Sequence, residues 1–495
     1  MMYGEEKSDS LIVAAKLANN PQGAESVERR SGAKGNAEQP HMRRTQSRES
    51  MSQRLSRVRE AAKQRKKERF TALFHLLTAE ALENAFLSLS RKAAAGVDGV
   101  RWKDYAENLK VNIADLHRRL HQGSYRAQPG RRHYIPKADG KQRPLGIASL
   151  EDKIVQYALV KILNAVYEND FMGFSYGFRP GRSQHNALDA LATGLVRTNV
   201  NWVLDADISQ FFDKVSHEWL IRFIEHRIGD QRVIRLIRKW LTAGTSEEGE
   251  WRASEEGTPQ GAVISPLLAN IYLHYVFDLW AHQWRRRHAT GNVVMVRYAD
   301  DIVIGFDKRI DAQCFRIAMQ RRLKEFGLTV HPKKTRLMEF GRFAAENRAS
   351  RGKGKPETFN FLGFTHISGK DRNGRFMLIR KTRRDRMTAT LKAIKDGLRK
   401  RWHYSIPEQG KWLRRVVQGY LNYHSVPGNY PMMRKFRIYV TDLWRRALRR
   451  RSQQDDTTWT KANRLAAVWL PKVRVLHPWP VERFTARHPR QEPGA

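Results

Sequence analysis

The chain has 495 residues, which is long enough for two or three folded units that each bury a hydrophobic core. It carries 91 Lys and Arg against 50 Asp and Glu, and this formal net charge of +41 makes a polyanion such as nucleic acid the expected partner. The single cysteine, Cys314, excludes internal disulfides and zinc modules built on cysteine pairs, and no apolar run approaches the roughly 18 residues of a spanning helix, so we expect a soluble cytoplasmic protein with no membrane partner.

The chain begins with a polar segment. Residues 1–55 are rich in Ser, Gln, Glu, Gly and Arg and show no hydrophobic period, which predicts a disordered polar and basic extension. The following region, residues 56–366, opens with a basic helical pattern and then mixes short strands with helices. Its Gly and Pro turn signals are typical of a catalytic domain.

Two adjacent carboxylates mark the centre of that region. Asp300 and Asp301 stand between the apolar runs at 293–296 and 302–304, a pattern that predicts a β-hairpin with both acids at its turn. Neighbouring carboxylates repel each other, and a divalent cation would relieve the repulsion. The alternative is an ordinary surface turn.

A further carboxylate is expected from another strand, because chemistry on phosphates often uses two cations held by a few acids. Residues 202–207 predict that strand, and its period of two places Asp205 and Asp207 on the same face. Spacing alone does not decide which of them would meet a metal. Either could instead cap the helix that is expected next.

The composition of the chain changes after residue 369. Residues 370–451 contain 24 Lys and Arg against 5 Asp and Glu on helical patterns, which predicts a basic helical domain. RNA duplexes are contacted mainly through their backbone and shape, so arginines on one side of a helix are candidate RNA contacts. The candidates in the last predicted helix are Arg445, Arg446, Arg449 and Arg450. Residues 452–495, punctuated by Pro and Trp, predict an irregular, partly packed tail that is a candidate for nucleic-acid contact.

Short motifs then occur in one order over about 230 residues. They are IPK at 135–137, RPLGI at 143–147, GFRPGRS at 177–183, DISQFFD at 207–213, GTPQG at 257–261, SPLLAN at 265–270, YADD at 298–301, GLTV at 327–330 and FLGF at 361–364. Flanking blocks are AGVDGV at 95–100 and GYLNYH at 419–424. This series resembles the reverse transcriptases encoded by group II introns, and the resemblance covers about residues 56–485.

The resemblance implies an α+β fold of the right-hand polymerase type, with fingers, a palm built on an antiparallel sheet, and a helical thumb or maturase domain. It implies an RNA-directed DNA polymerase with two Mg²⁺ ions held by Asp207, Asp300 and Asp301. It also implies binding of group II intron RNA, assistance to its splicing, and intron mobility by target-primed synthesis of cDNA from dNTPs on an RNA template with a DNA primer.

The resemblance assigns further residues to the incoming nucleotide. Lys137 and Arg143 would contact its triphosphate, with Lys141 as a nearby substitute for Lys137. Phe212 would lie under the sugar, although either Phe211 or Phe212 could be a core residue. Gln260 belongs to a loop with two glycines that would approach the new base pair, and Lys334, with Lys333 as the alternative, would help protonate pyrophosphate.

Arg179 and Arg182 fall in the block that follows the template in the family, and plain surface arginines are the alternative. With one cysteine and an end at Ala495, we expect no cysteine-containing endonuclease domain. Two other functions remain open at this point: an RNA-binding maturase without polymerase activity, and a domesticated reverse transcriptase that serves another RNA. The sequence does not set the oligomeric state.

Overall fold

The computed structural model describes residues 38–136, 142–247, 249–451 and 457–487, with side chains from residue 51 onward except at 136, 486 and 487. The helices are α2 (Glu38–Gln64), α3 (Ala79–Ser88), α4 (Trp102–Glu107), α5 (Leu109–His121), α6 (Leu150–Tyr167), α7 (Gln184–Arg197), α8 (His217–Glu225), α9 (Gln231–Thr242), α10 (Ser265–Leu273), α11 (Leu279–Arg287), α12 (Arg309–Glu325), α13 (Ala344–Ala349), α14 (Arg384–Arg399), α15 (Ile406–His424), α16 (Tyr430–Arg449), α17 (Trp459–Trp469) and α18 (Pro480–Arg487). The strands are β1 (Gly130–Pro136), β2 (Gln142–Ile147), β3 (Trp202–Asp207), β4 (Thr245–Glu247), β5 (Glu250–Arg252), β6 (Val293–Tyr298), β7 (Asp301–Phe306), β8 (Arg336–Glu339), β9 (Phe359–Phe361), β10 (Phe364–Lys370) and β11 (Phe376–Thr382). None of the helices described is long and apolar enough to cross a bilayer.

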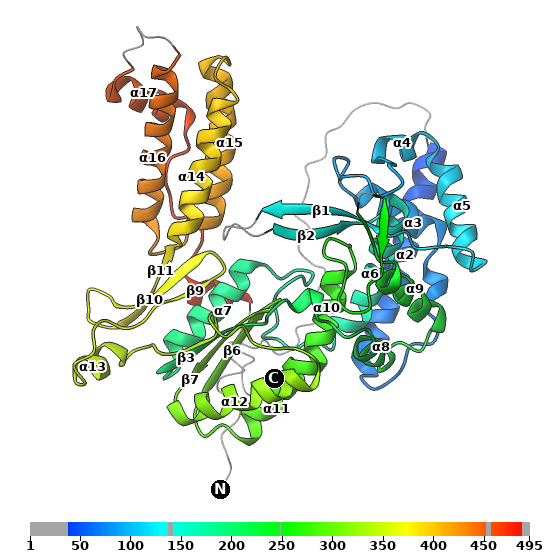
Figure 1. Cartoon of the computed structure of the whole chain (residues 1–495), viewed down its shortest axis with the longest axis horizontal. Helices are drawn as coiled ribbons and strands as arrows, with labels where there is room; N and C mark the ends of the chain where they lie inside the picture. The colour runs from blue at the N-terminus through cyan, green and yellow to red at the C-terminus, as the bar shows by residue number, and fades with distance from the viewer. Residues whose placement is uncertain (1–37, 137–141, 248, 452–456, 488–495) are drawn as a thin grey trace.

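The N-terminal part is helical and is built around α6 (Figure 1). Helix α6 begins at a cap in which Ser149 accepts a hydrogen bond from the backbone N–H of Asp152, and most of its side chains are buried. Helices α2 and α3 pack against it. Because α2 already begins at Glu38, it reaches into residues 1–55, where the sequence predicts only disorder.

A small sheet projects from this helical part toward the C-terminal helices (Figure 1). Its strand order is β2-β1-β4-β5, and β1 and β2 pair antiparallel from Arg131 opposite Ile147 to Pro136 opposite Gln142. The loop that joins β1 to β2, with Lys137 and Lys141, lies outside the described residues.

The central sheet has the order β6-β7-β3-β8 and is antiparallel throughout. One face packs on α12 and the large N-terminal core through Leu204, Met295 and Ile304. The other face packs on α7 through Val203, Val294, Val296 and Val303. Burial on both faces explains why these strands are nearly continuous apolar runs rather than alternating ones.

The C-terminal part begins with strands, not helices. The sheet β11-β10-β9 occupies residues 359–382, so the helices of the basic region begin only at Arg384. Figure 1 shows α14, α15 and α16 as three long helices side by side, standing away from the central sheet. Their apolar stripes form a separate core with residues of α17 and Leu470.

The tail is more regular than the sequence predicts. It contains α17, which packs on α15 and α16, and α18, which returns to pack on α7 beside the central sheet. Arg483 of α18 donates two hydrogen bonds to the buried carboxylate of Asp189 in α7. This contact joins segments 294 positions apart, which a local hydrophobic pattern does not reveal.

Candidate active site

Three aspartates lie at one end of the central sheet. Strand β3 ends at Asp207, and β7 begins at Asp301, which is the cross-strand partner of Asp207. Asp300 lies in the tight turn between β6 and β7, where Ala299 has a positive φ of 57°. The register therefore brings the candidate metal ligands from two separate sequence blocks to one edge.

Asp205 lies further from that edge. It pairs with Val303 of β7 and Arg336 of β8, so it lies two residue pairs inside the sheet, on the same face as Asp207. Burial, opposed by Arg336 and reinforced by Asp207, raises the pKa of Asp205 to about 6. The spacing of the sequence leaves the choice between Asp205 and Asp207 open, whereas the register places Asp207 opposite Asp301.

The charges at this edge disturb one another. Desolvation by the surrounding protein, followed by the negative charges of Asp300, Asp207 and Asp205, raises the pKa of Asp301 to about 7. Burial also raises the pKa of Asp300, an effect opposed by the cations Arg143 and Lys334. The Lys334 ammonium lies 2.9 Å from an Asp207 carboxylate oxygen, which brings Lys334 to the carboxylates.

The donor set suits a hard divalent cation. Among the residues described, no three His, Cys, Asp or Glu side chains are gathered closely enough to hold a metal by themselves. Mg²⁺, however, takes one or two carboxylates and completes its octahedron with phosphate oxygens and water. Asp207 and Asp301 are neighbouring carboxylates, and the raised pKa of Asp301 reflects a concentration of negative charge that such an ion would neutralise.

A glycine-containing loop lies beside this edge. Gly257 has a φ of 87°, and a Cβ there would come within 2.9 Å of the Phe212 carbonyl oxygen. Gly261 has a φ of 110°, and a Cβ there would come within 3.1 Å of the Gly146 carbonyl oxygen. Only glycine combines these angles with these approaches, so the loop is held against both β2 and the segment that follows β3.

Gln260 joins the same parts of the chain. Its backbone carbonyl accepts a 2.7 Å hydrogen bond from the Gly146 N–H, and its side-chain amide donates a 2.6 Å hydrogen bond to Asp213. The loop is thereby tied to β2 through its backbone and to the short helical turn at 211–213 through a side chain. The residues in both contacts belong to the sequence motifs, but the spacing of the motifs along the chain does not predict that these residues touch.

The two phenylalanines after β3 differ in exposure. Phe211 is buried, with 2% of its surface exposed, and belongs to the core, whereas Phe212 is half-buried beside it. Of the pair, Phe212 is therefore the ring that is partly accessible. Arg143 on β2 is exposed, and its positive charge opposes the rise in the pKa of Asp300. Lys137 lies outside the described residues.

The two arginines of the GFRPGRS block bind groups within the protein. The Arg179 guanidinium is buried, forms an ion pair with Glu168 at 2.9 Å, and donates to the carbonyls of Met172 and Ser175. Arg182 is half-buried, donates to the Gly173 and Ser175 carbonyls, and lies over the Tyr176 ring. The Arg179 donors are directed inward to protein acceptors, so this side chain has a structural role, and its contact with the template stays a prediction.

The four arginines of α16 are not equivalent. Arg445 is half-buried against Asp442 and the Trp459 ring, whereas Arg446, Arg449 and Arg450 are exposed. Arg446 also pairs with Asp442 at 2.7 Å. The structure therefore leaves Arg449 and Arg450 as the open cations of this group.

Sequence reasoning missed the group that supports the β6–β7 turn. Arg297 is fully buried and pairs with Asp278, which is also fully buried. The same guanidinium donates to Asn270 Oδ1 at 3.1 Å, to the Ala299 carbonyl at 3.0 Å and to Ser175 Oγ at 2.7 Å. The available signal is an arginine inside an otherwise apolar strand, directly before the YADD turn.

Comparison with known proteins agrees with this arrangement. Residues 135–366 match the model of the family described as reverse transcriptase (RNA-dependent DNA polymerase). Protein YkfC of Escherichia coli is 43% identical over 206 residues, which are 41% of this chain and 54% of that protein.

Two further relatives carry informative names. The group II intron-encoded protein LtrA of Lactococcus lactis is 37% identical over 223 residues, 44% of this chain and 37% of that protein. Nuclear intron maturase 2, mitochondrial, of Arabidopsis thaliana is 29% identical over 110 residues, 21% of this chain and 15% of that protein.

The chain thus spans about half or less of the length of these curated relatives. The family match nevertheless includes the carboxylate edge, the glycine loop and Lys334. Residues 135–366 thus match the reverse transcriptase family over just under half of the chain, and the chain is similar to a group II intron-encoded protein and to an intron maturase.

Proposed function

We propose that this chain is an RNA-directed DNA polymerase that also binds group II intron RNA, assists its splicing and supports intron mobility by target-primed cDNA synthesis. The observation that carries the proposal is the register that sets Asp207 opposite Asp301, beside Asp300, within the reverse transcriptase domain. In this proposal the helical part and the β1–β2 hairpin are the fingers, the central sheet is the palm, and α14–α16 form the thumb or maturase domain.

The proposed mechanism assigns work to residues at the carboxylate edge. Asp207, Asp300 and Asp301 would hold two Mg²⁺ ions, which supply activation of the primer hydroxyl and neutralisation of phosphate charge when bound. Arg143, with Lys137 on the same hairpin, holds the triphosphate of the incoming dNTP. Phe212 presents its ring to the sugar, and the Gly257–Gly261 backbone approaches the new base pair.

Lys334 has a proposed part in the same step. Its ammonium pairs with Asp207 at 2.9 Å, and this pairing positions it at the carboxylate edge, within reach of a departing pyrophosphate. Lys334 then acts as general acid toward pyrophosphate while the chain's other cations hold the product in place. Arg449 and Arg450 take part in the proposed contacts to intron RNA, because they are exposed on α16.

Primer extension on an RNA template with dNTPs and Mg²⁺ tests the proposal. The variant Asp300→Asn with Asp301→Asn removes two proposed ligands, and we expect extension to fall by at least about a hundredfold, because even partners of metal ligands contribute that much. Glu325→Gln with Glu357→Gln is the matched control, since it removes two exposed carboxylates far from the turn in sequence.

Splicing of the group II intron transcript that carries this reading frame is followed in the same preparations. We expect the Asp300 and Asp301 variant to retain splicing assistance, because RNA binding is assigned to other residues. No extension by the unmodified chain would contradict the polymerase proposal and leave an RNA-binding maturase. Extension without any effect on this transcript would indicate a reverse transcriptase that serves another RNA.

A further inference from the structure

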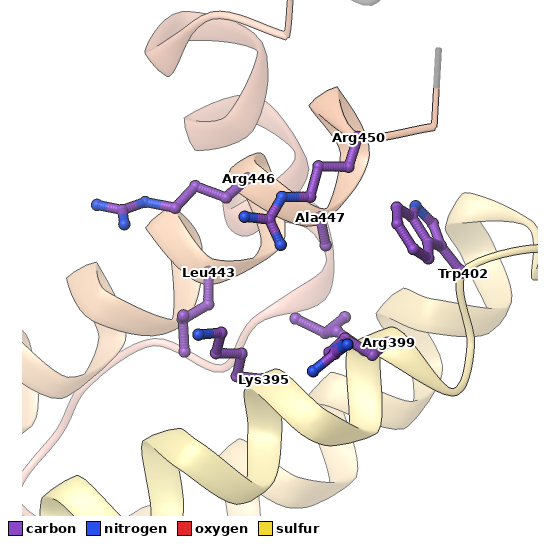
Figure 2. Close-up of a pocket in the computed structure, with 8 residues that line it drawn as sticks. Lys395, Arg399, Trp402, Leu443, Arg446, Ala447 and Arg450 are labelled. Carbon is purple, nitrogen blue, oxygen red and sulfur yellow. The ribbon is translucent and has the colours of Figure 1, made fainter.

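The C-terminal helices carry a pocket of their own, separate from the carboxylate edge. Figure 2 shows it between α14 and α16, and its volume is about 120 Å³. We call it the α14–α16 pocket, and its lining consists of Lys395, Leu398, Arg399, Trp402, Leu443, Arg446, Ala447 and Arg450. Neither the sequence motifs nor the family match, which ends at residue 366, accounts for it.

The floor of the pocket is apolar. Leu398 is buried and belongs to the core of the bundle, and Leu443 and Ala447 are half-buried beside it. A dry apolar cavity of about 150 Å³ in another protein holds benzene, so an open pocket of similar size has room for one planar ring. The floor therefore offers a surface on which an aromatic ring is removed from water.

The rim of the pocket is cationic. Lys395 and Arg399 from α14 and Arg450 from α16 have their charged ends around the opening in Figure 2, and all three side chains are exposed. Within the described part of the chain these three cations have no ion-pair partner, and the nearby Asp442 is already shared by Arg445 and Arg446. The exposed positive charge of the rim suits a phosphate.

Trp402 lies at one end of the pocket, in a turn whose backbone is held by hydrogen bonds from side chains. The side-chain amide of Gln409 donates a 2.7 Å hydrogen bond to the Arg401 carbonyl, and Arg451 donates to the Tyr404 carbonyl. These two contacts fix the backbone on both sides of Trp402, a residue that is 36% exposed. An indole presented in this way beside cations is the combination on which unstacked bases bind.

We propose that the α14–α16 pocket binds one unpaired nucleotide of a structured RNA. The base lies on the floor of Leu398, Leu443 and Ala447 next to Trp402, and its phosphate lies among Lys395, Arg399 and Arg450. This proposal rests on the proposed binding of intron RNA and deepens it, because a base in a continuous duplex is not free to enter. The bundle would thereby select a bulge or loop rather than any RNA helix.

Fluorescence anisotropy on the full chain tests the proposal with RNA hairpins of one sequence. The first hairpin has a single bulged uridine, whose base is one ring, the second is fully paired, and the third has an abasic bulge. We expect the bulged hairpin to bind about five- to tenfold more tightly than the other two, the lower end of what one stacked base contributes.

Two variants locate this preference. Trp402→Ala is expected to bind the three hairpins equally, and Arg399→Gln with Arg450→Gln is expected to lose more affinity for the bulged hairpin than for the paired one. Lys392→Gln with Arg434→Gln is the matched control, because it removes one exposed cation from each of the same two helices outside the pocket. This control should weaken all three hairpins by one common factor.

Several results would overturn the proposal. Equal binding of bulged and paired hairpins by the unmodified chain would do so, as would full binding of the abasic hairpin. Primer extension by the same preparation separates the two levels: if extension occurs while the bulge preference is missing, only the pocket proposal fails. If neither extension nor RNA binding occurs, the proposed function fails as well.

Discussion

At the scale of single residues, the end of the central sheet concentrates negative charge on buried carboxyl groups. Asp301 has its pKa raised to about 7 and Asp205 to about 6, and both shifts begin with desolvation. A carboxyl with a raised pKa is protonated at a higher pH than usual, so in the absence of a cation Asp301 carries a proton below about pH 7. Cation and proton therefore compete for the same group.

This competition predicts a pH-dependent requirement for Mg²⁺. As the pH falls from 8 to 6, the Mg²⁺ concentration for half-maximal primer extension should rise, by up to about tenfold per unit below pH 7, because metal binds the deprotonated carboxylate. Mg²⁺ titrations of extension at three pH values measure it. Asp205→Asn removes one of the charges that raise the pKa of Asp301 and should move the rise to lower pH; a requirement that is constant across this range would contradict the prediction.

At the scale of elements, the β6–β7 turn depends on a buried ion pair behind it. Arg297 holds the Ala299 carbonyl at 3.0 Å while Ala299 keeps its positive φ, and Asp278 neutralises the guanidinium. Strain in such a turn persists only where neighbouring groups fix it. The turn geometry that presents Asp300 and Asp301 is thus set by residues of β6 and of the helical segment after α10.

Variants of Arg297 should therefore affect stability and primer extension in different ways. Arg297→Met leaves Asp278 as an unpaired buried charge and should lower the free energy of unfolding by about 3–5 kcal/mol, and adding Asp278→Leu should recover much of that loss. Primer extension should stay low in both, because neither variant restores the hydrogen bond to the Ala299 carbonyl. Urea unfolding and extension are measured together; recovery of both in the double variant would show a role in stability alone.

The stability of the β9–β11 sheet should depend on pH. His366 in β10 is fully buried, stacked on Phe359 at 4.7 Å, and burial lowers its pKa to about 3. A histidine in the unfolded chain has a pKa of about 6.5, so between these values the unfolded state binds the extra proton. The stability that neutral His366 contributes is present above pH 6.5 and is lost as the pH falls below it.

Replacement of His366 should flatten this dependence. At pH 5 the unfavourable proton linkage amounts to about 2 kcal/mol for one such histidine, so His366→Phe should lose less stability between pH 7 and 5 than the unmodified chain by about that amount. Urea midpoints at the two pH values provide the measurement. His403→Gln, which removes an exposed histidine, should change nothing, and equal slopes for all three proteins would refute the argument.

At the scale of the whole molecule, the tail connects parts that are far apart in the chain. From α17 on the helical bundle it runs back along α15, where His477 contacts the Asn422 carbonyl at 2.7 Å, and ends as α18 on α7. Asp189 of α7 is buried between Arg483 of the tail and Arg380 of β11. One carboxylate therefore joins the central sheet, the β9–β11 sheet and the tail.

Loss of this junction should release the tail before it affects the sheet. Arg483→Ala removes both hydrogen bonds to Asp189, so amide hydrogen exchange should accelerate at 473–487 and in α7, while β3 and β7 keep their protection. Glu482→Ala, at the exposed neighbouring position of α18, is the control. Unchanged exchange in α18 of the Arg483 variant would mean that the junction does not hold the tail.

The sequence by itself indicated the resemblance and the region that carries it, because its ordered motifs are local, and the reverse transcriptase family model matches residues 135–366 of that region. It also indicated the β6–β7 hairpin, because apolar runs around a polar turn specify local structure. The tertiary structure alone decided the features that depend on distant contacts. Strand register places Asp207, not Asp205, opposite Asp301, and Arg179 forms an ion pair with Glu168. Arg297 supports the β6–β7 turn, and the tail forms α18, which packs on α7. The physical reason is that strand register and the pairing of buried charges are fixed by partners tens to hundreds of residues away, which no periodic pattern along the chain encodes.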